Sequence, residues 1–374
     1  MPSGPALQSK LVVLPVIVDM LSRFSNTATV LHSSVCFLHE ILALKDAVNG
    51  QTRLSQSEVI HQVYKIFYIR NINAIMNIIH FSDLHYSHLT IKKTKVVTVD
   101  PLINTLKKIN NENAIDLILF TGDLIDKGGV SFLSTDEAYL KFYEDILNPI
   151  CTAMGLSESR FIICPGNHDI QREADGDISE KGCLATFNNE DVVTAFIEGI
   201  KQGKPKNGVR RIESYKSFEE MVYGPKSENH YLSFFESAFK FKIDGKVIGI
   251  IALNSSWRCF SENDQGQLII GEKQIIDSLS FLADCDYKIA ISHHNTDNLV
   301  SFDRVLIEKL LMMNFELFLC GHVHSSSNKY IIEPKGKLIT LVAPGTLIQN
   351  ATTDSKQYSN GFSSTLVNFD TGKL

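Results

Sequence analysis

The stretch Cys164-Pro165-Gly166-Asn167-His168-Asp169 decides how the rest of this chain can be interpreted. It follows the apolar residues 161–163, which predict a buried parallel strand. Proline and glycine end strand pairing, so the polar triplet is expected at the carboxyl end of that strand, where open α/β sheets bind ligands. A loop of turn-forming residues would use the same letters. An amide, an imidazole and a carboxylate together nevertheless suit a metal site better than a core.

Four further clusters of the same kind follow apolar runs elsewhere in the chain. They are Asp83-Leu84-His85, Thr121-Gly122-Asp123, Ser292-His293-His294 and Gly321-His322-Val323-His324. In Asp-x-His and His-x-His, side chains two residues apart lie on the same side of an extended backbone and can reach one centre. Mixed carboxylate, imidazole and amide ligands favour Mn, Fe or Zn, and the lack of cysteine ligands disfavours a structural zinc. The set is too long for one ion, so we expect two divalent ions that share a carboxylate.

The order of predicted elements indicates the domain organisation. From Met76 onward strands alternate with helices, which predicts an α/β fold with a largely parallel sheet and right-handed crossovers. Asp100-Pro101 predicts the start of the first helix. Residues 170 to about 230 are polar and interrupt the alternation, so we expect an insertion over the site. Residues 1–75 hold no motif and predict a helical extension ahead of a domain at 76–374.

Composition narrows the setting of the protein. The 374 residues carry a net charge of −6, which gives no sign of a strongly basic nucleic-acid surface. A local basic patch within that total remains an alternative. No apolar run reaches membrane-spanning length, so no membrane partner is expected. The seven cysteines contain no C-x-x-C pair and do not resemble a disulfide framework. A reducing, cytoplasmic location follows as the simplest expectation, and the oligomeric state stays open.

In this order, the five clusters resemble the motifs of the calcineurin-like metallophosphoesterase superfamily. That family's pattern is D-x-H, G-D, G-N-H-[DE], H and G-H-x-H, and this chain meets it between Met76 and Asp370. The resemblance implies a four-layer sandwich, in which two mixed sheets face each other and helices cover their outer sides. It also implies a hydrolase that acts on phosphoesters with a dinuclear metal centre.

The resemblance assigns the ligands as two sets. One ion would be held by Asp83, His85, Asp123 and His324. The other would be held by Asp123 as the bridge, Asn167, His293 and His322. In the family pattern the ligand is the first histidine of the pair, which favours His293 over His294.

The implied chemistry is attack on phosphorus by a bridging hydroxide held between two metals about 3.5–4 Å apart. His168 is then a catalytic residue that stabilises developing charge or protonates the leaving group, and Asp169 is expected to fix its orientation. Asp126, in the spacing Gly-Asp-x-x-Asp, is not expected to bind a metal. We expect it to be a loop carboxylate or one that hydrogen-bonds to a metal ligand.

The substrate is narrowed but not identified. Protein serine/threonine phosphatases carry Arg and Glu where this chain has Lys127 and Asp169, which disfavours that branch. The stretch 253–257 loosely resembles small bacterial phosphodiesterases, so a phosphodiester is the expected substrate. A DNA or RNA nuclease and a phosphomonoesterase remain alternatives on the same site. A non-catalytic scaffold on this fold would lack ligands, and none is missing here.

Overall fold

The computed structural model describes residues 75–261, 264–323, 327–333, 336–342 and 361–369. The described residues belong to a compact unit that spans Ile72–Leu374. The expected helical extension at 1–75 lies outside the described residues apart from its last position, and so does His324. Within the described part, no helix has the length and apolar character needed to cross a bilayer.

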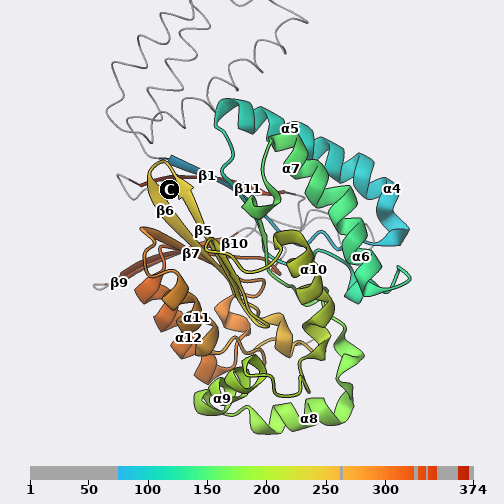
Figure 1. Cartoon of the computed structure of the whole chain (residues 1–374), viewed down its shortest axis with the longest axis vertical. Coiled ribbons are helices and arrows are strands. Elements are labelled where there is room, and N and C mark those ends of the chain that lie inside the picture. Colours follow the sequence, from blue (N-terminus) through green and yellow to red (C-terminus); the bar gives the residue numbers. More distant parts are fainter. Residues whose placement is uncertain (1–74, 262–263, 324–326, 334–335, 343–360, 370–374) are drawn as a thin grey trace, which may run out of the picture. The chain divides into compact units, whose positions relative to one another are not determined.

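Two mixed sheets form the centre of this unit (Figure 1). The first has the order β11-β1-β2-β3, with β11 antiparallel and the other three parallel. Its strands are β1 (Ile75–Phe81), β2 (Leu117–Phe120), β3 (Phe161–Ile163) and β11 (Ser363–Asn368). The second has the order β4-β5-β6-β7-β8-β10-β9. Its strands are β4 (His230–Leu232), β5 (Ser237–Ile243), β6 (Lys246–Ala252), β7 (Tyr287–Ile291), β8 (Leu317–Cys320), β9 (Ser327–Glu333) and β10 (Gly336–Val342).

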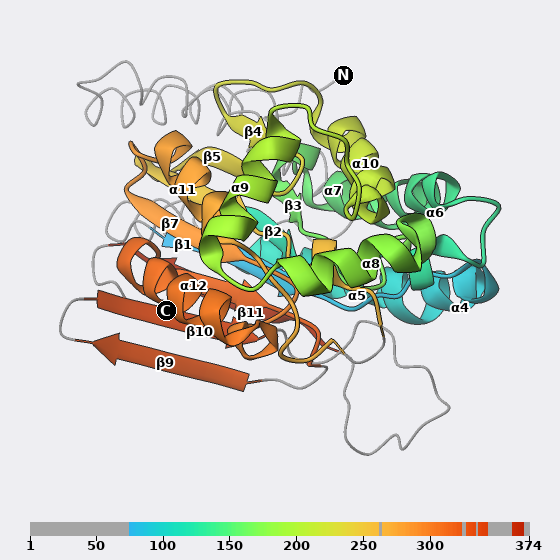
Figure 2. The ribbon, with the colours of Figure 1, turned by 90° about the horizontal axis from the view of Figure 1, so that it is seen from below.

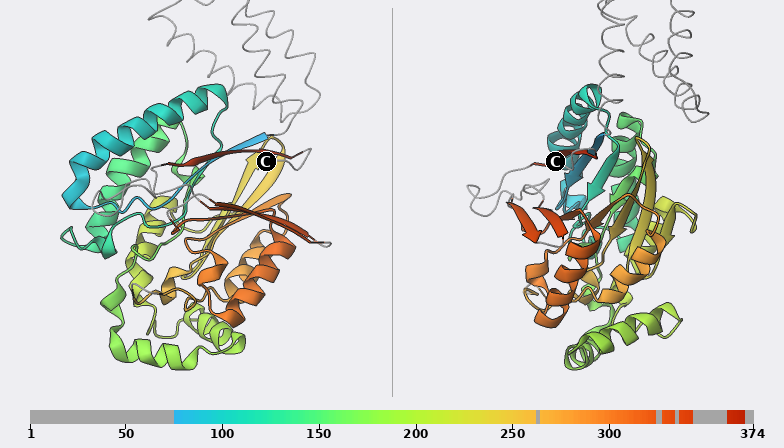
Figure 3. Two further views of the ribbon diagram at one scale, coloured as in Figure 1. Left: turned by 180° about the vertical axis from the view of Figure 1, so that it is seen from behind. Right: turned by 90° about the vertical axis from the view of Figure 1, so that its left-hand side faces the viewer.

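Helices cover the outer side of each sheet, as the two orientations in Figure 3 show. The first sheet carries α4 (Ile91–Thr94), α5 (Asp100–Glu112), α6 (Thr135–Phe142), α7 (Asn148–Met154) and α10 (Glu213–Tyr223). The second carries α11 (Glu272–Phe281) and α12 (Ser301–Asn314), and α9 (Glu190–Lys201) packs against α11. Successive side chains of a strand point to opposite faces of its sheet, so the second sheet contributes to two cores. Ile250 of β6 packs into the core shared with the first sheet, and its neighbour Ile251 packs into the core under α11 and α12. The expected four-layer sandwich of two mixed sheets is confirmed.

Two prolines sit inside helices instead of at their starts. α5 begins at Asp100 as predicted, but Asp100 is not a cap, because helical backbone already runs from Ile91 through a π-helical turn at Lys95–Val99 into α5. Pro149 likewise follows a π-helical turn at Tyr143–Leu147. A proline lacks an N–H and its ring clashes with the carbonyl four residues earlier, and a wider turn just before it relieves both problems.

The segment after β3 divides into two parts. α8 (Gly176–Thr186) and α9 lie in front of the sheets in the view of Figure 2. By contrast, α10 packs into the core of the first sheet, where Phe218 stacks on Tyr139 and the Tyr223 hydroxyl donates to the Phe161 carbonyl. The part of 170–230 that can form an insertion over the site is therefore confined to residues before α10.

Strand register makes neighbouring parallel strands end side by side, so that the motif loops begin next to one another. Phe81 pairs with Phe120 and Phe120 with Ile163, so the next residues of β1, β2 and β3 start their loops side by side. In the second sheet Ile291 pairs with Leu319, which does the same for the loops after β7 and β8. Parallel strands thus bring the first three motifs together at the first sheet, and the fourth together with the described residues of the fifth at the second.

Candidate metal centre

Backbone hydrogen bonds lock the first two motif loops together. The amide of Asp83 donates to the Gly122 carbonyl at 3.0 Å, and the amide of His85 donates to the Asp123 carbonyl at 2.9 Å. Asp83, His85, Asp123 and His322 all have positive φ, between 49° and 68°. L-residues rarely adopt this conformation, and it persists where surrounding contacts impose it. Four of the predicted metal ligands therefore occupy strained backbone positions, which is typical of functional sites.

Two motif glycines allow the loops to approach each other. A Cβ on Gly122 would lie 2.6 Å from Nδ1 of His293 and 2.7 Å from the amide nitrogen of Gly166. A Cβ on Gly166 would overlap the side chain of Asp123. The glycines of G-D and G-N-H-D are therefore required by the close contact between the strand ends.

Asp123 lies at the centre of the cluster. Its Oδ2 is 3.7 Å from Nε2 of His85 and 3.4 Å from Nε2 of His293, and its Oδ1 accepts the amide of His168 at 2.8 Å. Burial alone would raise the pKa of Asp123, but the neighbouring His293, His85 and His168 outweigh it and hold that pKa well below its usual value. The carboxylate is thus charged and flanked by imidazoles from both sheets.

His293 presents one nitrogen to this centre. Its Nδ1 donates to the carbonyl of Thr121 at 2.6 Å, which leaves Nε2 to face Oδ2 of Asp123 and Oδ1 of Asn167, the latter at 3.1 Å. Burial alone would lower the pKa of His293, but the charge of Asp123 raises it to about 9. A ring nitrogen oriented by a bond from the opposite nitrogen to a backbone carbonyl is the usual arrangement of a metal-binding histidine.

His294 is held differently. Its Nδ1 is 2.8 Å from Oγ of Ser255, which itself accepts the hydroxyl of Ser292 at 3.2 Å. The Ser255 proton is therefore directed at Nδ1, so the ring proton of a neutral His294 resides on Nε2, 4.0 Å from Sγ of Cys259. Burial keeps the pKa of His294 well below its usual value. Ser255 thus occupies the Nδ1 atom of this ring.

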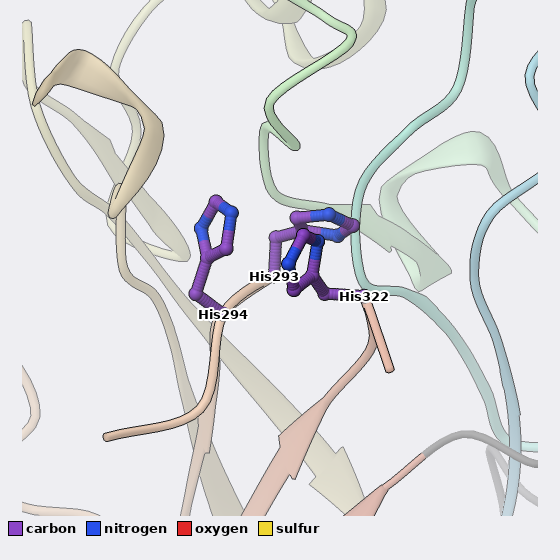
Figure 4. Close-up of side chains that lie close together, drawn as sticks. All are labelled: His293, His294 and His322. Carbon is purple, nitrogen blue, oxygen red and sulfur yellow. The ribbon is translucent and has the colours of Figure 1, made fainter. Parts of the chain in front are cut away.

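The donor atoms of the described residues fit metal ions. Potential ligand atoms form three groups, and within each group these atoms lie within 4.8 Å of one another. The groups are His85 with Asp123 and His168, Asp83 with Asp123 and His293, and His293 with His294 and His322. Figure 4 shows the three histidines of the last group gathered at one place. Carboxylate oxygens, imidazole nitrogens and the Asn167 amide oxygen form a donor set that suits Mn, Fe or Zn.

Most predicted ligands therefore come together. Asp83 and His322 are joined directly, because the amide of His322 donates to Oδ2 of Asp83 at 3.2 Å. Asp83, His85, Asp123, Asn167, His293 and His322 lie in one cluster. The seventh predicted ligand, His324, is outside the described residues.

The orientation expected for His168 requires a correction. Its Nδ1 is 3.0 Å from Oδ1 of Asp126. Asp169 instead accepts the amides of Gly166 at 2.8 Å and Ile125 at 3.0 Å, so it holds the loop and not the ring. Burial alone would lower the pKa of His168, but the hydrogen bond that its ring donates to Asp126 and the charge of Asp123 raise that pKa above its usual value.

Sequence reasoning missed two residues that orient this centre, and it missed the partner of a third. The two are Thr121, which contacts His293, and Ser255, which contacts His294; the third is Asp126, whose partner is His168. The spacing Gly-Asp-x-x-Asp pointed to Asp126 without its partner, and the stretch 253–257 was noted for resemblance alone. Thr121 acts through its backbone carbonyl, so no side-chain pattern signals it.

Comparison with known proteins places the motifs in a family. The model of the calcineurin-like phosphoesterase family matches residues 76–326. A curated relative from Bacillus subtilis, described as an uncharacterized metallophosphoesterase-like protein, is 23% identical over 252 residues, which cover 66% of this chain and 48% of the relative. This chain thus spans about half the length of that relative.

Solved structures with similarity to this chain include two phosphatases. A purple acid phosphatase from yellow lupin has a TM-score of 0.42 and 12% identity, over 79% of this chain and 49% of that one. A dimetal phosphatase from Danio rerio has a TM-score of 0.37 and 9% identity, over 73% and 88%. GAP50 from the inner membrane complex of Plasmodium has a TM-score of 0.38 and 14% identity, over 79% and 82%.

Proposed function

Because this chain belongs to the calcineurin-like phosphoesterase family, we propose that its domain hydrolyses a phosphoester with the help of two divalent metal ions. One observation carries the proposal. The Oδ2 atom of Asp123 lies between Nε2 of His85 and Nε2 of His293, at 3.7 and 3.4 Å. A single carboxylate oxygen between ligands from two sheets is the arrangement needed for a bridging ligand.

The ligand sets follow from that bridge. Asp83, His85 and Asp123 would hold one ion, together with His324 as the family pattern implies. Asp123, Asn167, His293 and His322 would hold the other. The contacts support His293 over His294, since Nε2 of His293 faces Asp123 and Asn167 while Nδ1 of His294 is bonded to Ser255. Mn, Fe and Zn all suit these donors.

His168 is proposed to act on the leaving group. Its Nδ1 faces Asp126, and the raised pKa of His168 favours the imidazolium, whose Nε2–H can give a proton or a hydrogen bond to a substrate oxygen. Its backbone amide is held by Asp123, which fixes the ring relative to the ligands. Bound ions would supply Lewis acidity and a reactive water. The chain's own contribution is to hold this acid next to the cluster, and Asp169 supports it by maintaining the loop.

A phosphodiester is the proposed substrate, in a cytoplasmic setting. A monoester dianion needs extra cationic clamps, commonly arginine, whereas a diester carries a single charge. The motif loops carry Lys127 and Arg172 beside the ligands, and neither belongs to a ligand motif. A departing alkoxide also needs a proton, which gives His168 its role.

Hydrolysis of two model substrates tests this proposal. The metal-loaded protein should hydrolyse bis(p-nitrophenyl) phosphate with a higher kcat/KM than p-nitrophenyl phosphate, with Mn, Fe and Zn compared in parallel. His168→Ala should retain its metals and lose about 10²–10⁴-fold in kcat, while Asp123→Asn should lose metal. A preference for the monoester would redirect the proposal to a phosphomonoesterase. An inactive protein that binds two metals would refute hydrolysis itself.

A further inference from the structure

Large aliphatic side chains are exposed at one corner of the domain. Leu89 is 86% exposed and Leu133 is 95% exposed. Exposed lysines alternate with such residues. We call this set the basic-apolar face, and it comprises Leu89, Lys92, Lys93, Lys95, Val96, Val97, Lys127, Val130 and Leu133. Isolated exposed aliphatic residues are ordinary, but a contiguous group of them marks an interaction surface.

The two segments that form this face are physically joined. The Ser87 hydroxyl donates to Oγ of Ser131 at 3.0 Å, and the His88 amide donates to the same oxygen at 2.9 Å. The ring of Phe132 packs against the rings of Tyr86 and His88, with centroids 5.8 and 5.6 Å apart. Figures 1 and 2 both show α4 beside the loop that precedes α6. The segments 86–97 and 127–133 thus form one surface.

This surface is locally basic, and the carboxylates of Asp126, Asp136 and Glu137 lie at its border. Neither residues 86–99 nor residues 127–135 contain an aspartate or glutamate, whereas the whole chain has a net charge of −6. Four lysines in these segments are exposed. The face would therefore attract an anionic partner that the rest of the protein repels.

The face also borders the candidate metal centre. Residues 86–97 continue directly from His85, and the backbone amide of Lys127 lies 3.3 Å from Nδ1 of His168. Whatever occupies the face is therefore brought next to the site where a phosphoester would be cleaved.

We propose that the basic-apolar face docks the protein on an anionic phospholipid surface. Aliphatic side chains inserted between lipid head groups, with lysines paired to lipid phosphates, are the recognised combination for peripheral membrane binding. A nucleic acid would match the lysines, but its phosphates would leave the exposed Leu and Val side chains without an apolar partner. The proposal adds a partner where the sequence predicted no membrane contact, a prediction that considered only spanning segments.

Vesicle flotation of the full chain tests the proposal without requiring hydrolysis. The protein should float with vesicles that contain about one-third phosphatidylserine and remain unbound with pure phosphatidylcholine. Binding should weaken strongly at about 1 M salt, where screening acts within about 3 Å. Because this assay needs no turnover, it can fail or succeed independently of the proposed phosphoesterase activity.

Matched variants locate the binding surface. Lys92→Glu with Lys93→Glu should weaken binding at least about 25-fold, since each lysine near an anionic surface contributes roughly fivefold. Leu133→Asp should also weaken binding to the vesicles, and the remaining binding should depend on salt as it does in the wild type. The control is Val305→Asp on α12, a residue that is 69% exposed and distant in sequence from the face. Hydrolysis of a soluble substrate should be the same in all of these variants.

Three results would overturn the proposal. One is a wild-type protein that does not float with anionic vesicles at low salt. A second is equal loss of flotation in Leu133→Asp and Val305→Asp. The third is a protein that does not float but self-associates in sedimentation and loses that association in Leu133→Asp, which would assign the face to a second copy of this chain.

Discussion

At the scale of single residues, the distance between strand ends depends on Gly122. It has a φ of 87°, and an added Cβ would meet both His293 and Gly166. Gly155, at the end of α7, has a similar φ of 67° but no atom within 4 Å of an added Cβ. The two glycines therefore separate the effect of backbone conformation from the effect of close contact.

Gly122→Ala should destabilise the protein more than Gly155→Ala. The left-handed backbone costs about 1–2 kcal/mol in either variant, and forced overlap at Gly122 adds about 1–3 kcal/mol. Chemical denaturation measures the difference, and metal analysis should show that only Gly122→Ala loses bound metal. Equal destabilisation would mean that the loops near Gly122 can relax.

Asp126→Asn should lower kcat while metal content stays the same. The substitution keeps an acceptor oxygen but removes the negative charge that raises the pKa of His168, and such supporting changes typically reduce activity about 10–100-fold. Asp169→Asn is the comparison, because this residue holds the amides of Gly166 and Ile125. It should lower stability more than Asp126→Asn does. If Asp126→Asn leaves kcat unchanged, His168 is not oriented by this residue.

At the scale of elements, a buried ionic network attaches α8 to the loop after β6. The guanidinium of Arg211 contacts Asp175 at 3.3 Å and also Glu180, and Arg258 contacts Glu180 at 3.3 Å. Arg211 also donates to the carbonyl of Cys259, in the loop that holds His294. Both arginines are buried. The residues before α10 are thus fixed to the rim of the site.

Arg211→Ala should cost about 3–5 kcal/mol of unfolding free energy, because it leaves buried carboxylates without their partner. Limited proteolysis should then cut preferentially between residues 175 and 211. Arg210→Ala, at the exposed neighbour of Arg211, should behave like the wild type. Unchanged proteolysis in Arg211→Ala would show that packing alone holds α8.

Asp303 links α12 to the residue stretch before α11 and should make stability depend on pH. Its carboxylate accepts the amides of Ile270 and Gly271, at 2.6 and 2.9 Å. Burial, together with the charges of Glu190 and Glu272, raises its pKa to about 7 from 3.8. The protonated form is therefore favoured in the folded state, so stability falls as pH rises from about 4 to about 7.

Relative to Asp303→Asn, the wild-type protein should lose about 4 kcal/mol of unfolding free energy over that pH range. Urea denaturation of both proteins at each pH gives this difference, and taking the difference cancels other titrating groups. A wild-type protein that gains stability relative to the variant would mean that the two backbone hydrogen bonds outweigh burial.

At the scale of the whole molecule, the family match and the described structure coincide. The match begins at residue 76, one residue after β1 starts at Ile75. Every described candidate ligand lies within the unit Ile72–Leu374. We therefore propose that residues 1–71 are separable from metal binding.

Deletion of residues 1–71 should leave metal content and hydrolysis of bis(p-nitrophenyl) phosphate within about twofold of the full chain. The physical reason is that no predicted ligand precedes Asp83. Circular dichroism checks that the shortened protein is folded. A folded protein that binds metal but is inactive would place the deleted segment in the active site.

The sequence by itself determined the location of the site and the class of fold. Apolar runs that end in Asp, His or Asn are local signals, because strands in a parallel sheet end at one edge. The motifs around Asp83, Asp123, Asn167, His293 and His322 could therefore be expected to meet. Alternation of strands and helices was enough to predict the α/β layers.

Only the tertiary structure decided which groups orient the site. Asp126 and His168 are 42 residues apart, and Ser255 and His294 are 39 apart, so no local periodicity relates them. Their contacts depend on strand register, and a shift of one residue would turn each side chain to the opposite face. For the same reason the sequence assigned the orientation of His168 to its neighbour Asp169. The folded chain directs that neighbour at backbone amides and brings Asp126 to the ring.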